Sequence, residues 1–180
     1  MKTKPQYATN VAKALEVILW VAARLDVPDV YRIVKAIYYG DLHHIANYGR
    51  PITGEDYQAD TFGPLARVTY GILRGRPIEL IALDLNGPLP FTVDGLHRVI
   101  PTRAANEHCL SESDTEALSH GIEAVRGKTF NQICRETHDH VAYVDADGGR
   151  MDYRLFIPKS DPEWEAKAEY IRDSATNAVI

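Results

Sequence analysis

The sequence has little cysteine, since its 180 residues contain only Cys109 and Cys134. Two thiols at this separation match none of the paired spacings of zinc sites, and they do not make a disulfide framework. Long apolar runs are also absent: the longest, residues 17–23, is far shorter than the roughly 20 residues that cross a bilayer. The opening residues lead into a polar stretch and not into the apolar core of a secretion signal. We therefore expect a cytoplasmic protein without membrane segments.

Positive charge is in deficit, because 20 lysines and arginines face 25 aspartates and glutamates, for a net charge of -5. An acidic chain is repelled by phosphate backbones, which disfavours binding to nucleic acid. Arg67, Arg74 and Arg76 nevertheless fall close together and leave room for a local basic patch, although solvated surface charge is the simpler interpretation. A nucleic-acid-binding regulator is therefore kept as an alternative hypothesis.

Sequence motifs of the common catalytic sites are missing. The chain has no Gly-x-Ser-x-Gly elbow and no Gly-Lys-Ser/Thr step of a phosphate-binding loop. The best metal-ligand candidate is the run 136–140, where His138 and His140 lie beside carboxylates, as in some zinc sites. No second ligand cluster is in register with it, and His43 and His44 are neighbours on a predicted helix, pointing about 100° apart. We predict no catalytic residue, metal or cofactor, and keep a metal hydrolase as the lesser alternative.

Apolar residues recur at helical spacing through most of the chain, which predicts a mainly helical fold. Capping residues mark several of the expected N-termini: Asn10 (or Thr9), Asp29, Ser111 with Asp114, and Thr129. Gly49 is expected to end the second helix, and Gly63-Pro64 to begin the third. The predicted helices span residues 10–25, 29–47, 64–75, 111–127, 129–137 and 161–175.

A single β-hairpin is expected within residues 89–100. Asp94-Gly95 between Phe91–Val93 and Leu96–Val99 is typical of a two-residue type I′ turn. The apolar residues of 77–85 recur neither at helical nor at strand spacing, and this segment is expected to be a weak strand or a helix-like turn.

Residues 50–61 and 144–149 are expected to be loops, and no internal repeat or low-complexity linker interrupts the chain. Together these features predict a mainly α protein: a compact single-domain helical bundle with a small β-hairpin, spanning residues 1–180.

Three stretches of the sequence share an order and spacing with one known family. The first is the apolar run 33–39, the second runs from residue 48 to residue 65, and the third joins Leu-Ser-Glu at 110–112 to Thr-Phe at 129–130 and Thr-His at 137–138. Over residues 9–140 the chain resembles the SocA-like antitoxin family (Panacea domain). Members usually have a tryptophan shortly after the Thr-His pair, and here Tyr143 takes that place. The residues that carry the resemblance are Lys35, Tyr38, Gly49, Pro51, Gly63, Pro64 and His138.

The resemblance implies an antitoxin-like or phage-associated protein that binds a partner protein, a cognate toxin, and performs no catalysis. It leaves open the toxin's identity, the oligomeric state and whether the toxin is blocked or delivered to a protease. Aromatic side chains anchor many protein interfaces. Tyr31, Tyr39 and Tyr48 flank the buried stripe of the second helix and either complete the core or face a partner. The segment 50–61 has the same two interpretations, a structural turn or a binding surface. The candidate contact residues are Tyr39, Tyr48, Arg50, Asp56 and Tyr57.

Overall fold

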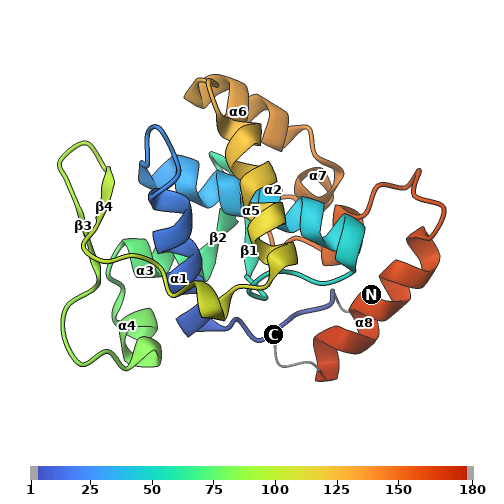
Figure 1. The fold of residues 1–180 in the computed structure, drawn as a ribbon. Coiled ribbons are helices and arrows are strands. Elements are labelled where there is room, and N and C mark those ends of the chain that lie inside the picture. The colour runs from blue at the N-terminus through green and yellow to red at the C-terminus, as the bar shows by residue number, and fades with distance from the viewer. Residues whose placement is uncertain (1–3, 178–180) are drawn as a thin grey trace.

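The computed structural model describes residues 4–177 and confirms the prediction of a mainly helical fold. Its centre is formed by two helices that pack across each other, α2 (Val30–Tyr48) and α5 (Glu112–Val125) (Figure 1). The other elements are α1 (Val11–Ala22), β1 (Tyr57–Asp60), β2 (Gly63–Ala66), α3 (Arg67–Leu73), α4 (Pro77–Leu83), β3 (Phe91–Val93), β4 (Val99–Pro101), η1 (Glu107–Cys109), α6 (Phe130–His138), α7 (Val141–Ala146), η2 (Tyr153–Phe156) and α8 (Trp164–Asn177). Within residues 4–177, no helix is long and apolar enough to cross a membrane.

Two glycines let α2 and α5 approach closely. A Cβ on Gly121 of α5 would lie 2.0 Å from the Ala36 carbonyl oxygen on α2, so no larger residue fits there. A Cβ on Gly40 would lie 3.2 Å from the Ala117 carbonyl oxygen. Small residues on both helices therefore determine the crossing, and the apolar side chains around it form the centre of the core.

The predicted helix caps are present. The side chain of Asn10 accepts from the Lys13 amide at 3.0 Å, and that of Asp29 accepts from the Arg32 amide at 2.8 Å. Both Ser111 and Thr129 form capping boxes. These interactions are local in sequence, which is why the sequence predicts these helix starts correctly.

The loop prediction for residues 50–61 was wrong at its end, because Tyr57–Asp60 forms β1 and pairs with β2. Gly63-Pro64 therefore lies in a strand and does not begin a helix, and α3 begins only at Arg67. Asp60 pairs with Gly63, so Thr61 and Phe62 form a tight turn. Gly63 has φ 89°, a left-handed value that favours glycine over other residues.

The second hairpin exists, but its predicted two-residue turn was wrong. Val93 pairs with Val99, which leaves five residues, 94–98, in the loop. The Asp94 carboxylate accepts from the amides of Leu96 and Arg98 at 2.8 and 2.9 Å. The aspartate thus organises a wider loop through its side chain, and the left-handed residue is His97, with φ 62°.

Two further segments resolve as short helices. Residues 77–83 form α4, so the helical one of the two alternatives is the right one. The loop prediction for residues 144–149 was wrong in its first half, because α7 extends to Ala146. His140 caps α7, its Nδ1 accepting from the Ala142 amide at 3.3 Å. A histidine cap is less common than Ser, Thr, Asp or Asn, so this helix start has no clear signal in the sequence.

Candidate protein-interaction surface

Lys35 joins two of the three signature stretches. It lies in the middle of α2 with 2% of its surface exposed, and its Nζ donates to the Pro64 carbonyl oxygen at 2.7 Å. Burial of the ammonium lowers the pKa of Lys35 to about 7, against the opposing influence of Cys134 and Asp60. The β1–β2 hairpin is therefore held on α2 by a buried lysine and not only by apolar packing.

Gly63 lies against Thr137, which belongs to the third signature stretch. A Cβ at this position would lie 2.4 Å from Thr137 Oγ1 and 2.9 Å from Lys35 Nζ. The Thr137 hydroxyl itself donates to the Ile133 carbonyl oxygen within α6, at 2.9 Å. Lys35, Gly63-Pro64 and Thr137 thus meet at one point, where α2, β2 and α6 come together.

An exposed aromatic cluster borders this junction. Phe62 in the β1–β2 turn is 57% exposed, and Phe130 at the start of α6 is 41% exposed. Their ring centroids lie 5.5 Å apart in an edge-to-face arrangement, and Phe130 lies 4.4 Å from the half-buried Tyr31 of α2. We call Tyr31, Phe62 and Phe130 the aromatic patch. Each of the three elements that meet at Lys35 contributes to it or adjoins it.

Tyr39 of α2 contacts α6 beside two charged residues. Its hydroxyl donates to Glu136 of α6 at 3.2 Å, and Lys128 pairs with the same carboxylate at 2.6 Å. Burial and the neighbouring Glu136 raise the pKa of Tyr39, so the phenol stays protonated. Tyr39 is half-buried and therefore shows part of its ring to solvent.

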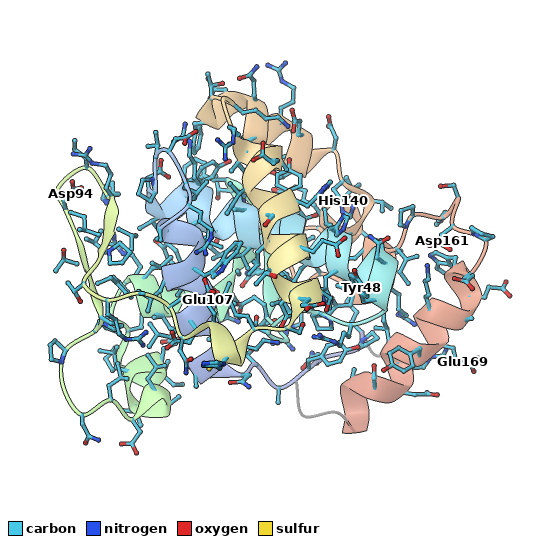
Figure 2. All side chains as sticks on the ribbon, in the orientation of Figure 1. Tyr48, Asp94, Glu107, His140, Asp161 and Glu169 are labelled. Carbon is cyan, nitrogen blue, oxygen red and sulfur yellow. The ribbon has the colours of Figure 1, made fainter. Side chains whose placement is uncertain are left out.

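Tyr48 and Arg50 lie elsewhere, beside the N-terminal part of α5. Tyr48, labelled in Figure 2, is 43% exposed. Its hydroxyl donates to Glu116 at 2.6 Å. Arg50 pairs with the buried Asp114 at 3.3 Å and lines a cavity of about 500 Å³ between the N-terminal segment, α5 and α8. Asp114 also pairs with Lys13 at 2.9 Å, so the charges of this cavity are largely matched within the protein.

Asp56 and Tyr57 occupy a third region. Asp56 pairs with Arg150 at 2.6 Å and with Arg67 at 3.4 Å. Tyr57 is 2% exposed and donates to the fully buried Asp41 at 2.8 Å. The structure therefore gives Tyr57 no surface to offer to a partner, and the five candidate contact residues do not form one continuous site.

The two histidines of the metal hypothesis have separate settings. The ring of His138 stacks on Tyr143 at 4.5 Å, and its Nε2 lies 3.8 Å from Cys134 Sγ. His140 caps α7, and burial lowers the pKa of its imidazole. In the part of the chain that the structure describes, no three His, Cys, Asp or Glu side chains are grouped to hold a metal ion.

Sequence reasoning missed the aromatic patch and two buried carboxylates. Phe130 falls in the same helical stripe as the buried Ile133, so periodicity assigns it to the core. Asp41 and Glu55 are fully buried although nothing near them in sequence pairs with their charge. Asp41 accepts from the Ile52 amide and Tyr57, and Glu55 accepts from amides of α3. Such partners lie far along the chain and give no local signal.

The fold and this surface define a mainly helical protein in which three separate sequence stretches meet, with exposed aromatic rings on the adjoining elements. The model of the family described as antitoxin SocA-like, Panacea domain, matches residues 33–142, more than half of the 180-residue chain. The chain belongs to this family. The matched range contains Lys35, Gly63, Pro64, Thr137 and the aromatic patch except for Tyr31.

A curated protein with partial similarity is the GDP-mannose-dependent alpha-mannosyltransferase of Corynebacterium glutamicum. The chain is 33% identical to it over 109 residues, which is 58% of this chain and 26% of that enzyme. The chain thus spans about a quarter of the length of this relative. No solved structure matches the chain.

Proposed function

We propose that this protein is a cytoplasmic antitoxin that binds a cognate toxin directly and neutralises it without catalysis. Membership of the SocA-like family supports an antitoxin-like role and a protein partner. The observation that carries the choice of surface is the aromatic patch, because Phe62 and Phe130 expose large rings on the β1–β2 turn and α6, two of the elements that carry the family's sequence stretches.

The patch has the properties of an interface anchor. Aromatic side chains carry much of the binding energy at protein interfaces, particularly where they are surrounded by polar groups that exclude water. The ring contacts among Tyr31, Phe62 and Phe130 already hold the side chains in place, so binding costs little further rotamer entropy. Lys128 and Glu136 supply a charged border that favours one orientation of the partner.

A transferase function is not favoured by the mannosyltransferase match, because that match spans only about a quarter of the enzyme. Among residues 4–177 the sheets are two antiparallel pairs, β1–β2 and β3–β4. Neither pair provides the parallel sheet at whose edge doubly wound folds bind nucleotides. A non-catalytic role therefore agrees better with the architecture and with the family.

The test begins with the partner. The tagged protein is purified with the product of the adjacent gene, and the candidate toxin is expressed with and without this chain while growth is followed. The double variant Phe62→Ser/Phe130→Ser is compared with Val141→Ser/Val144→Ser, which removes two exposed side chains from α7. Circular dichroism confirms that both variants fold.

Wild type and the α7 variant are expected to bind the toxin and restore growth, whereas the patch variant loses both effects. If the wild type neither binds a toxin nor protects against one, the antitoxin proposal is wrong. If it does both and the patch variant is equally effective, the function stands but the aromatic patch is not its surface.

A further inference from the structure

Helix α4 carries apolar residues on two sides, because Leu80 and Leu83 are half-buried while two isoleucines face solvent. None of its residues is buried, and Ile78 and Ile81 are 74% and 79% exposed. Its acidic residue, Glu79, points toward the protein, because a Cβ on Gly71 of α3 would lie 2.3 Å from the Glu79 carboxylate. A surface helix normally buries its apolar stripe and exposes its charges. Here two isoleucines one turn apart face solvent together.

Two exposed arginines precede these isoleucines in the sequence. Arg74 ends α3 and Arg76 begins α4, and both are exposed. Across the described residues neither guanidinium forms an ion pair, and that of Arg76 lies 5.2 Å from the ring of Tyr70. The other three arginines of residues 67–103 are paired: Arg67 with Asp56, Arg98 with Asp94 and Arg103 with Glu16. Arg74 and Arg76 are therefore the guanidinium groups of this region that remain open to an acidic partner.

The β3–β4 hairpin exposes further apolar side chains on the same side of the molecule. Leu96 in its loop is 70% exposed and Ile100 on β4 is 50% exposed. Figure 1 shows α4 and the hairpin together at one edge, opposite α8, and Figure 2 shows Asp94 at the tip of the hairpin. We call residues 74–100 the arm; it shares no residue with the aromatic patch.

We propose that the arm is a docking surface for an acidic amphipathic helix of a partner protein. The apolar face of such a helix would cover Ile78 and Ile81, and carboxylates flanking that face would reach the guanidinium groups of Arg74 and Arg76. Arginine forms two parallel hydrogen bonds with a carboxylate, which sets the orientation as well as the attraction. Apolar anchors at helical spacing are the usual way in which a helix binds a surface groove.

A second copy of this chain fits the arm less well. A two-fold symmetric contact would bring arm against arm and place Arg74 and Arg76 opposite their own like charges. A head-to-tail contact onto the acidic remainder of the chain does not close unless the rotation happens to form a ring. Nucleic acid would engage the arginines but leave Ile78 and Ile81 in water. The acidic helix satisfies both the charge and the exposed apolar area.

The experiment uses the whole protein and a fluorescein-labelled amphipathic peptide of about 15 residues, long enough to form a helix, with leucines at helical spacing flanked by glutamates. A matched peptide carries lysine in place of each glutamate. Fluorescence anisotropy gives the dissociation constants for wild type, Ile78→Ser/Ile81→Ser and Arg74→Glu/Arg76→Glu. Val144→Ser and Lys159→Glu serve as controls for an exposed apolar and an exposed basic residue away from the arm.

Wild type is expected to bind the acidic peptide at least about tenfold more tightly than the lysine peptide. The isoleucine variant loses at least about tenfold in affinity, the arginine variant reverses the preference, and both controls behave as wild type. Because all four substituted arm residues are exposed, the variants keep the wild-type circular dichroism spectrum and melting temperature.

The proposal is overturned if the acidic peptide fails to bind, binds no better than the lysine peptide, or binds the arm variants as well as wild type. It is also overturned if sedimentation shows a wild-type dimer that the isoleucine variant abolishes, or if a DNA duplex binds through Arg74 and Arg76 while the acidic peptide does not. The Phe62→Ser/Phe130→Ser variant binds the peptide normally if the two surfaces are independent, so failure here and failure of the toxin proposal are separate results.

Discussion

The Lys35 ammonium and the Pro64 carbonyl oxygen, 2.7 Å apart, connect the middle of α2 to the β1–β2 hairpin inside the protein. The pKa of Lys35 is lowered to about 7 from its usual 10.5 because the ammonium is buried. Between these values the unfolded chain holds a proton that the folded protein has released. The free energy of unfolding therefore rises with pH across this window, by up to about 1.4 kcal/mol per pH unit for one proton.

Lys35→Met removes this titration. The variant leaves the Pro64 carbonyl oxygen without its donor, but it also removes a poorly solvated charge, so the informative quantity is the pH dependence. Urea unfolding at about pH 6, 7.5 and 9 measures the free energy of unfolding of both proteins. Wild type is expected to gain stability relative to the variant as the pH rises. A constant difference would mean that Lys35 is not buried as a weakly basic amine.

Gly63→Ala tests how closely the hairpin approaches α2 and α6. The new Cβ meets Thr137 and Lys35, and the left-handed backbone at φ 89° adds strain, so the expected loss of stability is about 2–5 kcal/mol. Gly148→Ala is the matched control, because Gly148 has φ 77° and open space around its Cβ position. It is expected to lose only the backbone contribution, about 1–2 kcal/mol. Thermal and chemical unfolding measure both losses. If the two variants lose equal stability, the new Cβ at residue 63 is accommodated without a steric cost.

The sequence predicts the fold best where the stabilising interactions are local. The side chains of Asn10, Asp29, Ser111 and Thr129 cap helices within three residues of themselves, and all four helix starts follow. Gly63-Pro64 has an equally good local signal for a helix start, but its contacts are with α2 and α6, and pairing with β1 prevails. Tertiary contacts of this kind leave no periodic pattern in the sequence.

The candidate site follows the same rule. Lys35, Gly63 and Pro64 are identified as signature residues from the sequence, but their contact with one another is visible only in the structure. Tyr57 is of a residue type common at interfaces, yet it is buried. Its hydroxyl donates a hydrogen bond to Asp41, sixteen positions earlier in the chain. A tyrosine in a polar stretch does not reveal whether its hydroxyl has a partner inside the protein.

Glu55→Gln tests a helix cap supplied from a distance. The N-cap residue of α3, Ala66, has no side-chain acceptor, and the Glu55 carboxylate instead accepts from the amides of Val68 and Thr69 at 2.8 and 2.9 Å. Glutamine has one acceptor oxygen, so its NH₂ group faces an amide donor. We expect a loss of about 1–3 kcal/mol in urea unfolding. Glu169→Gln, at an exposed position on α8, is expected to change stability little; if both variants unfold alike, Glu55 does not cap α3.

Asp41→Asn is expected to change the pH dependence in the direction opposite to Lys35→Met. Burial raises the pKa of Asp41 to about 7 from its usual 3.8, although the Ile52 amide and the Tyr57 hydroxyl both donate to it. Between these values the folded protein holds a proton that the unfolded chain has lost. Its contribution to the free energy of unfolding is therefore full below about pH 4 and is lost as the pH rises through 7.

Asparagine cannot titrate, and it keeps an acceptor for the Ile52 amide while its NH₂ group donates to the Tyr57 oxygen. Wild type is thus expected to lose stability relative to Asp41→Asn between about pH 5 and pH 8, by no more than about 1.4 kcal/mol per pH unit. Urea unfolding across this range measures the difference. A difference that stays flat or grows in favour of wild type would mean that Asp41 is already ionised at low pH in the folded protein. Lys35 and Asp41 both lie on α2 and both have a pKa of about 7, but they change the free energy of unfolding in opposite directions as the pH rises. The slope of that free energy against pH, compared between wild type and each variant, therefore identifies which residue controls the stability of the core at each pH.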